Sequence, residues 1–456
     1  MRVVLQAAVL KTARRALTSD GYLHKTVIPT FKFQDSLPKL KIPKLEDSLQ
    51  KYVASATPLV SPDELQQTKA VVDDFANTEG KILQDHIVAE DKKHYSSYIS
   101  APWFDMYLRF RDPLPINMNP QLTMKDDPDP AKHKQAPRAA SLISASVAFY
   151  RTLRDRQLSP DVYHTKPHRS ETPFFQQLVK MAPNAAAWYI GFGFGAFALD
   201  MSQYANLFSS TRVPQPTKDQ LVVFDERQSR HIIIQYGHDF FKLNVLHQDG
   251  TAVPEAEIRA ALEDITSKPA STAAPPLGAA TTMNRDKWAT LRNKVMGASP
   301  RNLQHMSDID SALFAVCLED SAPGCAPMTP LGGATGDEYV ELSEAMLYGN
   351  GRNRWFDKSF QLIVTENGKS AVNFEHSWGD GVAVLRYFQE VYKESIATPT
   401  PDPRPKEQAV KLDFDFTDEL SAELKTAAEE FDAFKNTIDM KVLQTQVRSA
   451  SHMRWM

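Results

Sequence analysis

The clearest hydrophobic pattern in the chain predicts a β-hairpin that ends in a histidine. Two short runs, residues 360–364 and 372–376, place an apolar side chain at every second position up to His376. Asn367 and Gly368 lie between the runs, and this pair tolerates the positive φ values that a tight primed turn requires. We therefore expect His376 to lie at the end of a rigid strand, where a glycine-rich segment begins.

Helical and strand periodicities alternate over much of the remaining sequence. A capping-box pattern from Ser61 to Glu64, with proline at the first helical position, predicts a helix that runs towards Ile87. Further elements are expected as helices at 139–156, 255–265, 285–296 and 417–435, and as strands at 220–225, 231–237, 240–247 and 313–318. Since helices and strands alternate without repeats, we expect an α/β fold with a mixed sheet and flanking helices.

Residues 181–199 form a charge-free run between Lys180 and Asp200. The run approaches the ~20 residues that span a bilayer, but Pro183 and three glycines disfavour a spanning helix. An interfacial or re-entrant segment, a buried core element and a membrane span are the alternatives. The glycines also satisfy the loose dinucleotide pattern, but the flanking sequence lacks the strand, helix and acid that nucleotide binding requires.

The first nineteen residues carry four basic side chains and no acidic one. Apolar residues recur around a helix there without a compact apolar core, which favours a mitochondrial transit peptide; an ordinary amphipathic helix is the alternative. A proline-rich break at 395–409 indicates a domain boundary. We therefore expect a leader at 1–34, a main domain at 35–394, and a linker with the start of a further domain at 395–456.

The composition excludes several classes of function. The formal charge of −4 over 456 residues disfavours nucleic-acid binding, which requires a basic surface. Cys317 and Cys325 are the only two cysteines, so neither a disulfide scaffold nor a cysteine-based zinc cluster is expected, and we predict no metal site. Cys317 lies in an apolar run and is expected to be buried.

His376 and Asp380 are the candidate catalytic residues. Imidazole titrates near neutrality, so a histidine here can take a proton from an alcohol or a thiol and return it. A histidine on a strand is more often a structural residue, but this one is followed by glycines and by a carboxylate four positions on. The sequence has no G-x-S-x-G elbow and no convincing cysteine nucleophile, which favours direct transfer over an acyl-enzyme mechanism.

Residues 354–381 resemble the histidine signature of the carnitine/choline acyltransferase family, and residues 37–52 resemble its N-terminal signature. The segments PWFDMYL at 102–108 and LDMSQY at 199–204 are further similar to the mitochondrial inner-membrane members that act on long acyl chains. Two long signatures in the right order make the resemblance specific, and it extends over roughly residues 35–440.

This resemblance implies reversible transfer of a long-chain acyl group between CoA and carnitine, with His376 as general base and Asp380 as its carboxylate partner. It also implies that Trp103 and Tyr107 lie on the carnitine side, where an aromatic face suits a trimethylammonium group. Core packing is the alternative for both aromatic residues. No cofactor is implied beyond the substrates CoA and acyl-CoA.

The resemblance further implies a fold of two α/β halves that are similar to chloramphenicol acetyltransferase. It implies a peripheral position on the matrix side of the mitochondrial inner membrane, with residues 178–208 contacting the membrane surface.

The chain departs from the family pattern towards its C-terminal end. The family's lysine-rich CoA segment, its Tyr/Ser/Thr motif for the carnitine carboxylate and its Ser-Thr-Ser stretch are not found before Met456, so we expect the second half of the fold to be mostly missing. One hypothesis is a carnitine acyltransferase of the palmitoyl type that is weak or inactive as this chain. The other is a non-catalytic truncated form that at most binds a partner. Choline or short-chain acyl transfer is disfavoured by the apolar run and the transit-like start.

Overall fold

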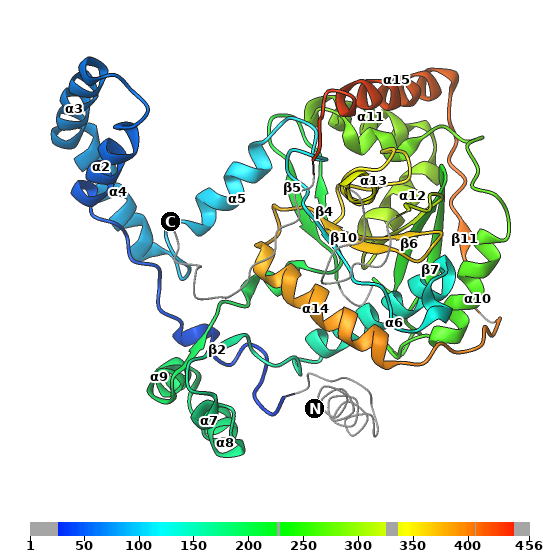
Figure 1. Cartoon of the computed structure of the whole chain (residues 1–456), viewed down its shortest axis with the longest axis horizontal. Helices are drawn as coiled ribbons and strands as arrows, with labels where there is room; N and C mark the ends of the chain where they lie inside the picture. The colour runs from blue at the N-terminus through cyan, green and yellow to red at the C-terminus, as the bar shows by residue number, and fades with distance from the viewer. Residues whose placement is uncertain (1–25, 226–228, 325–335, 406, 442–456) are drawn as a thin grey trace. The chain divides into compact units, whose positions relative to one another are not determined.

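The computed structural model describes residues 26–225, 229–324, 336–405 and 407–441 (Figure 1). The chain divides into two compact units. The smaller unit is Ser36–Tyr107, and the larger unit contains the described residues on either side of it. The predicted leader at 1–34 lies largely outside the described residues.

The smaller unit is helical, with α2 (Leu45–Ala56), α3 (Pro62–Asn77), α4 (Glu79–Lys93) and most of α5 (Ser100–Arg109). The capping box predicted at the start of α3 is confirmed, because Glu64 N donates to Ser61 Oγ and Ser61 N donates to Glu64 Oε2 at 2.9 Å. The prediction of one continuous helix to Ile87 is wrong. The chain leaves helical geometry at Thr78, where φ is −117° and ψ is −104°, and the backbone of Gly80 then packs closely against Phe75.

The larger unit is built on a seven-stranded mixed sheet, which confirms the expected α/β class. Its strand order is β1-β10-β9-β8-β6-β7-β11. β6, β8 and β9 run parallel to one another, and the other neighbouring pairs are antiparallel. The strands are β1 (Gln121–Thr123), β6 (His231–Tyr236), β7 (Asp239–Asn244), β8 (Ala315–Glu319), β9 (Phe360–Thr365), β10 (Ser370–Phe374) and β11 (Val410–Lys411).

Helices cover both faces of this sheet (Figure 1). One face packs against α6 (Gln135–Arg154), α10 (Glu255–Thr266) and α14 (Gly381–Ala397). The opposite face packs against α11 (Arg285–Ala298), α12 (Pro300–Ser311) and α13 (Gly336–Leu347). Successive residues of one strand therefore enter different cores: Leu362 contributes to the first core and Ile363 to the second. The two strands of the predicted hairpin, β9 and β10, are buried along their whole length.

The remaining elements of the larger unit are short. Two small antiparallel sheets pair β2 with β3 and β4 with β5. The elements are β2 (Val162–His164), β3 (Ala196–Ala198), β4 (Ser210–Val213), β5 (Gln220–Val223), α7 (Pro167–Ser170), α8 (Pro173–Met181), α9 (Asn184–Phe194), and the 3-10 helices η1 (Gln34–Ser36), η2 (Pro130–Lys132), η3 (Ser202–Asn206) and η4 (Leu277–Thr282).

The segment after the predicted boundary at 395 joins the larger unit. Its strand β11 pairs with β7 at the edge of the main sheet. Its helix α15 (Asp418–Lys435) packs on η4 and α11 through Leu420 and Leu424. The division into domains at 35–394 and 395–456 stays a prediction.

The turn of the hairpin differs from the primed turn that we expected. Gly368 N donates to Thr365 O at 3.0 Å, and Thr365 N donates to Lys369 O at 2.9 Å. Only Gly368 has a positive φ, of 77°, so the connection is a three-residue loop closed by a left-handed glycine. A side chain at Gly368 would also lie 2.7 Å from Lys132 O, so both conformation and space require glycine there.

His231, at the start of β6, gives the sheet a testable pH dependence. Burial lowers the pKa of His231 to about 4, although Nε2 contacts Asp308 O at 2.7 Å. Because the folded-state pKa lies below the ordinary value, the unfolded state binds the proton first. The contribution of His231 to stability is therefore fully present above about pH 6.5 and is lost as the pH falls towards 4.

From these two pKa values, His231 accounts for about 2 kcal/mol of the fall in the free energy of unfolding between pH 7 and pH 5. We expect the fall to be smaller by this amount in His231→Gln. Urea unfolding of both proteins at the two pH values measures this difference. An unchanged pH dependence in the variant would contradict the assignment to His231.

Candidate active site

His376 lies directly after the buried hairpin, in the loop that joins β10 to α14. Strand β10 ends at Phe374, so the strand is two residues shorter than its alternation predicted. The imidazole is partly exposed, and its ring stands edge-on to Phe374 with the ring centroids 5.9 Å apart. His376 therefore lies in the loop two residues beyond the strand, rather than at the strand end as expected.

Both neighbours of His376 are buried and hydrogen-bonded. Glu375 Oε1 pairs with Arg212 Nη1 at 2.9 Å, and Glu375 Oε2 accepts hydrogen bonds from Ser377 N and Ser377 Oγ. The backbone of Glu375 donates to Ser359 O at 3.0 Å, and the indole of Trp378 donates to the same carbonyl at 2.8 Å. The loop on which the imidazole is mounted is therefore fixed immediately before and after it.

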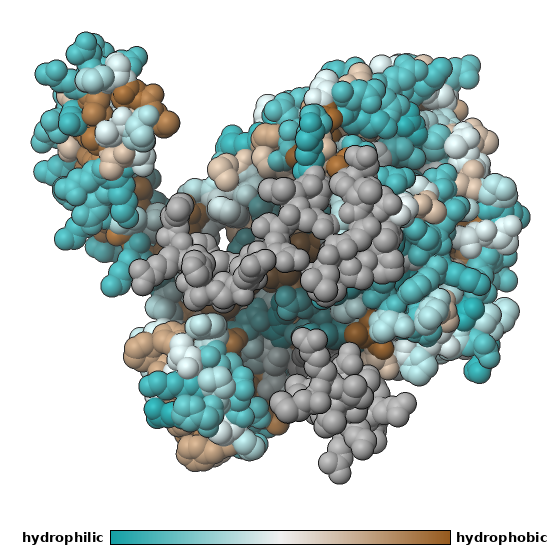
Figure 2. Space-filling view, viewed as in Figure 1, coloured by the Kyte–Doolittle hydropathy of each residue, from teal (hydrophilic) through white to brown (hydrophobic). Residues whose placement is uncertain are grey.

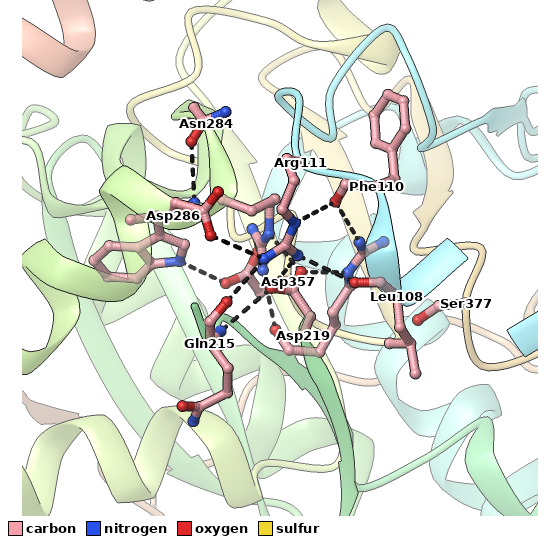
Figure 3. A network of polar contacts seen from close by, with 12 residues as sticks. Leu108, Phe110, Arg111, Gln215, Asp219, Asn284, Asp286, Asp357 and Ser377 are labelled. Atoms are coloured by element: carbon pink, nitrogen blue, oxygen red, sulfur yellow. Dashed lines mark hydrogen bonds and ion pairs between the residues drawn. The ribbon is translucent and has the colours of Figure 1, made fainter. Parts of the chain in front are cut away.

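Arg212 connects this loop to a buried network of charges (Figure 3). Asp219 Oδ2 accepts from Arg212 Nε and from Arg285 Nε, each at 2.7 Å. Arg285 Nη1 then pairs with Asp357 Oδ1 at 2.6 Å. Burial alone would raise the pKa of Asp219, but Arg285 and Arg212 outweigh it and keep this pKa below its ordinary value. Asp219 is therefore ionised at neutral pH. Burial instead raises the pKa of Asp357, although Arg285 and Trp288 contact its carboxylate.

Two further contacts complete the network. Trp288 Nε1 donates to Asp357 Oδ2 at 2.7 Å, and Arg111 Nη2 pairs with Asp219 Oδ1 at 2.6 Å. Figure 3 shows the side chains of Arg111, Asp219 and Asp357 converging on one another. Sequence reasoning missed the structural role of these residues. The one available signal was that Asp357 belongs to the segment that resembles the family signature.

Asp380 is exposed and directly precedes helix α14. Asp380 is the N-cap residue, and its carboxylate accepts a hydrogen bond from Gly381 N, the first backbone N–H of the helix, at 2.7 Å. The structure thus gives Asp380 a local role at the helix terminus that follows the histidine loop. Its predicted role as the carboxylate partner of His376 stays a prediction.

Trp103 and Tyr107 lie on α5 in the smaller unit. Their ring centroids are 5.0 Å apart, at an interplanar angle of 57°. The two rings thus form a local aromatic pair. Because they belong to a different compact unit from His376, their carnitine-facing role stays a prediction.

Cys317 is buried in β8, as expected. Its Sγ donates to Gln361 Oε1 at 3.1 Å, and burial raises the pKa of the thiol to about 12. A protonated, inaccessible thiol is a poor nucleophile. Cys325 lies outside the described residues.

The charge-free run at 181–199 folds into α9, a left-handed turn at Gly195 and β3. With 11 residues, α9 is about 16 Å long, roughly half the thickness of a bilayer core. In the part of the chain that the structure describes, no helix is long and apolar enough to cross a membrane. Hydrophobic residues nevertheless lie on the surface of the lobe formed by α7, α8 and α9, at the lower left of Figure 2.

Residues 40–454 match the family model of choline/carnitine O-acyltransferases. The chain therefore belongs to this family. Among individual relatives, it is 41% identical over 433 residues to the mitochondrial carnitine O-palmitoyltransferase 2 of Macaca fascicularis and 40% identical to that of Homo sapiens. It is 29% identical over 427 residues to the carnitine O-acetyltransferase of Mus musculus.

The alignments with the two palmitoyltransferases cover 93% of this chain and 63% of each relative. The alignment with the acetyltransferase covers 90% of this chain and 61% of the relative. The chain thus spans less than two thirds of the length of these relatives.

Proposed function

We propose that this chain transfers long-chain acyl groups reversibly between CoA and carnitine, with His376 as the general base. The observation that carries the proposal is the position of His376. Its imidazole is accessible, yet it is mounted on a loop that buried contacts fix on both sides. Such rigidity suits a proton transfer that depends on exact alignment of the reacting groups. The higher identity to palmitoyltransferases than to an acetyltransferase favours a long acyl chain.

The proposed reaction proceeds in one direct transfer. A neutral imidazole nitrogen of His376 takes the proton of the carnitine hydroxyl, and the oxygen attacks the thioester carbonyl. The tetrahedral intermediate collapses by breaking the carbon–sulfur bond, and the imidazolium returns its proton to the CoA thiolate. The reverse reaction begins with removal of the thiol proton. Asp380 would support the imidazolium by its charge, and Trp103 and Tyr107 would face the trimethylammonium group.

The assay combines palmitoyl-CoA, carnitine and purified chain, and follows both thiol release and palmitoylcarnitine by mass spectrometry. We expect thiol release that requires carnitine, is slower with acetyl-CoA, and is absent with choline. If no palmitoylcarnitine forms even at enzyme concentrations equal to those of the substrates, the catalytic proposal fails for this chain.

A non-catalytic, partner-binding role is the second candidate, and the surface of the smaller unit favours it. In helices α2, α3 and α4 of the smaller unit, Gly80 is the only buried residue among those that the structure describes. Large apolar side chains are exposed there, including Leu59 (82%), Val71 (68%) and Ile82 (70%). Apolar surface of this kind is typical of protein–protein contacts. A failed transfer assay would leave this role as the preferred one.

The lobe of α7, α8 and α9 is proposed to contact the matrix face of the mitochondrial inner membrane. Phe174 and Met181 are exposed on α8, and Tyr189 and Phe192 are exposed on α9. Aromatic residues favour the boundary between water and lipid, and exposed apolar area drives interfacial binding. The expected position is peripheral.

We expect the double variant Tyr189→Ser/Phe192→Ser to bind anionic lipid vesicles at least 10-fold more weakly, since burial of one such side chain contributes about 1.5–3 kcal/mol. Co-sedimentation with vesicles measures the change. The control is Leu303→Ser, which removes a comparably exposed apolar residue from α12. Equal vesicle binding by the double variant and the control would contradict a membrane-contacting lobe.

A further inference from the structure

We propose that Gln203 is a positioning residue for His376, because its side-chain carbonyl fixes the loop between β10 and helix α14. The inference rests on the proposed function of His376. It concerns the second half of the loop, which the contacts of Glu375, Ser377 and the Trp378 indole do not reach.

Two side chains of η3 hold the backbone of this second half. Asp380 N donates a hydrogen bond to Gln203 Oε1 at 2.7 Å. Asn206 Nδ2 donates to Trp378 O at 3.2 Å. Both backbone groups lie between the end of β10 and the first turn of α14. Asp380 N and Trp378 O thus have amide side chains as hydrogen-bond partners, in place of the backbone groups that a strand or a helix would supply.

Gly379 shows how closely Gln203 approaches the loop. A Cβ added to Gly379 would lie 3.3 Å from Gln203 Cβ and 3.4 Å from Gln203 Oε1. These distances are at or below ordinary van der Waals contact. The φ angle of Gly379 is not in the left-handed region, so close packing rather than backbone conformation explains this glycine. Gln203 is therefore packed against the loop as well as hydrogen-bonded to it.

The 3-10 helix η3 is itself anchored to α14. Tyr204 OH donates to Asp161 Oδ2 at 2.5 Å, and the other oxygen of Asp161 pairs with Arg386 Nη1 at 2.6 Å. The Arg386 guanidinium also lies over the Tyr204 ring, 5.8 Å from its centroid. Burial, followed by the charge of Asp161, raises the pKa of Tyr204, so its hydroxyl remains a donor.

Gln203 thus belongs to η3, which is anchored to α14, the helix that follows the histidine loop. Through these contacts, the loop that carries His376 and the N-cap residue Asp380 are kept in one arrangement. Loss of the acceptor at position 203 should loosen Gly379 and Asp380 while the sheet stays folded. A displacement of about 1 Å at reacting groups can lower a rate by about 100-fold. We therefore expect an effect on turnover rather than on substrate binding.

Two substitutions separate the hydrogen bond from the packing. Gln203→Met keeps the volume of the side chain and removes the acceptor, whereas Gln203→Glu keeps an acceptor oxygen. We expect Gln203→Met to lower kcat about 10- to 100-fold with the KM values for carnitine and palmitoyl-CoA within about 2-fold. Gln203→Glu should restore most of the rate. Ser202→Ala, an exposed position of the same turn, is the matched control and should leave kcat unchanged.

A second readout does not depend on activity. Diethyl pyrocarbonate acylates accessible imidazole nitrogens, and peptide mass spectrometry gives the rate at each histidine. We expect the rate at His376 to change at least about 3-fold in Gln203→Met, with the rate at His247 as an unchanged internal reference. Unchanged kcat together with an unchanged rate at His376 would overturn the proposal. Equal changes at His376 and His247 would also overturn it, because they would indicate general loosening of the fold. If the chain proves inactive, the proposed reaction fails, but the labelling rates still decide whether Gln203 positions His376.

Discussion

Replacing His376 by alanine is expected to lower kcat for palmitoyl transfer by about 10²- to 10⁴-fold, the usual contribution of a general base. Without the imidazole, the carnitine hydroxyl has no group to take its proton as its oxygen attacks the thioester. The side chain is partly exposed and makes an edge-on contact with Phe374, so its loss should change the melting temperature little. Thiol-release kinetics and thermal unfolding of the same preparations measure both quantities.

His247→Ala is the matched control for this experiment. His247 is also partly exposed and lies in the turn after β7, outside the proposed site. The variant should retain the parental rate. A His376→Ala protein that keeps its rate while His247→Ala also does so would contradict the assignment of the base.

Replacing Arg212 by methionine is expected to destabilise the larger unit by about 3–5 kcal/mol. The substitution leaves two buried carboxylates, Glu375 and Asp219, without one of their cationic partners. Arg212 is fully buried, so water cannot replace the lost contacts. Because Glu375 precedes His376 directly, kcat should also fall in the fraction of protein that remains folded.

Arg301→Met provides the comparison for a surface ion pair. Arg301 pairs with Asp415 at 3.2 Å, and its side chain is 59% exposed. Pairs of this kind contribute at most about 1 kcal/mol. Urea unfolding of the two variants should therefore differ by several kcal/mol. Equal destabilisation by the two substitutions would mean that the buried network contributes no more than a surface pair.

Local sequence patterns were sufficient to predict several elements and the position of the candidate base. The capping box at Ser61 and Glu64 depends on residues three positions apart, and the structure has it as expected. The hairpin before His376 depends on an alternating pattern around Asn367 and Gly368. The loop type was wrong because both a primed turn and a bulged turn accept this pair, and the structure gives a positive φ to Gly368 alone.

The burial of Gln361 in β9 could not be predicted from the local pattern. Gln361 lies between Phe360 and Leu362, and a polar residue between two apolar ones favours a position on a solvated face. Gln361 is instead buried, where its Nε2 donates to Asn373 Oδ1 at 3.2 Å and its Oε1 accepts from Trp355 N at 2.9 Å. Internal hydrogen bonds replace water here, and they join partners that a single strand pattern cannot reveal.

The contacts that fix the histidine loop could not be predicted from sequence spacing. Arg212 and Glu375 are separated by 163 positions, and Gln203 and Asp380 by 177. No periodicity connects residues at such distances. The sequence therefore indicated which residue could act as the base, whereas the folded chain was needed to find what holds it in place.

The pH dependence of thiol release shows whether His376 is the general base. A general base acts only when it is unprotonated, so the rate of the parent protein should rise with pH and then level off. His376→Ala should keep only a residual rate that lacks this rise. The same rise in parent and variant, or an unchanged rate in the variant, would contradict His376 as the base.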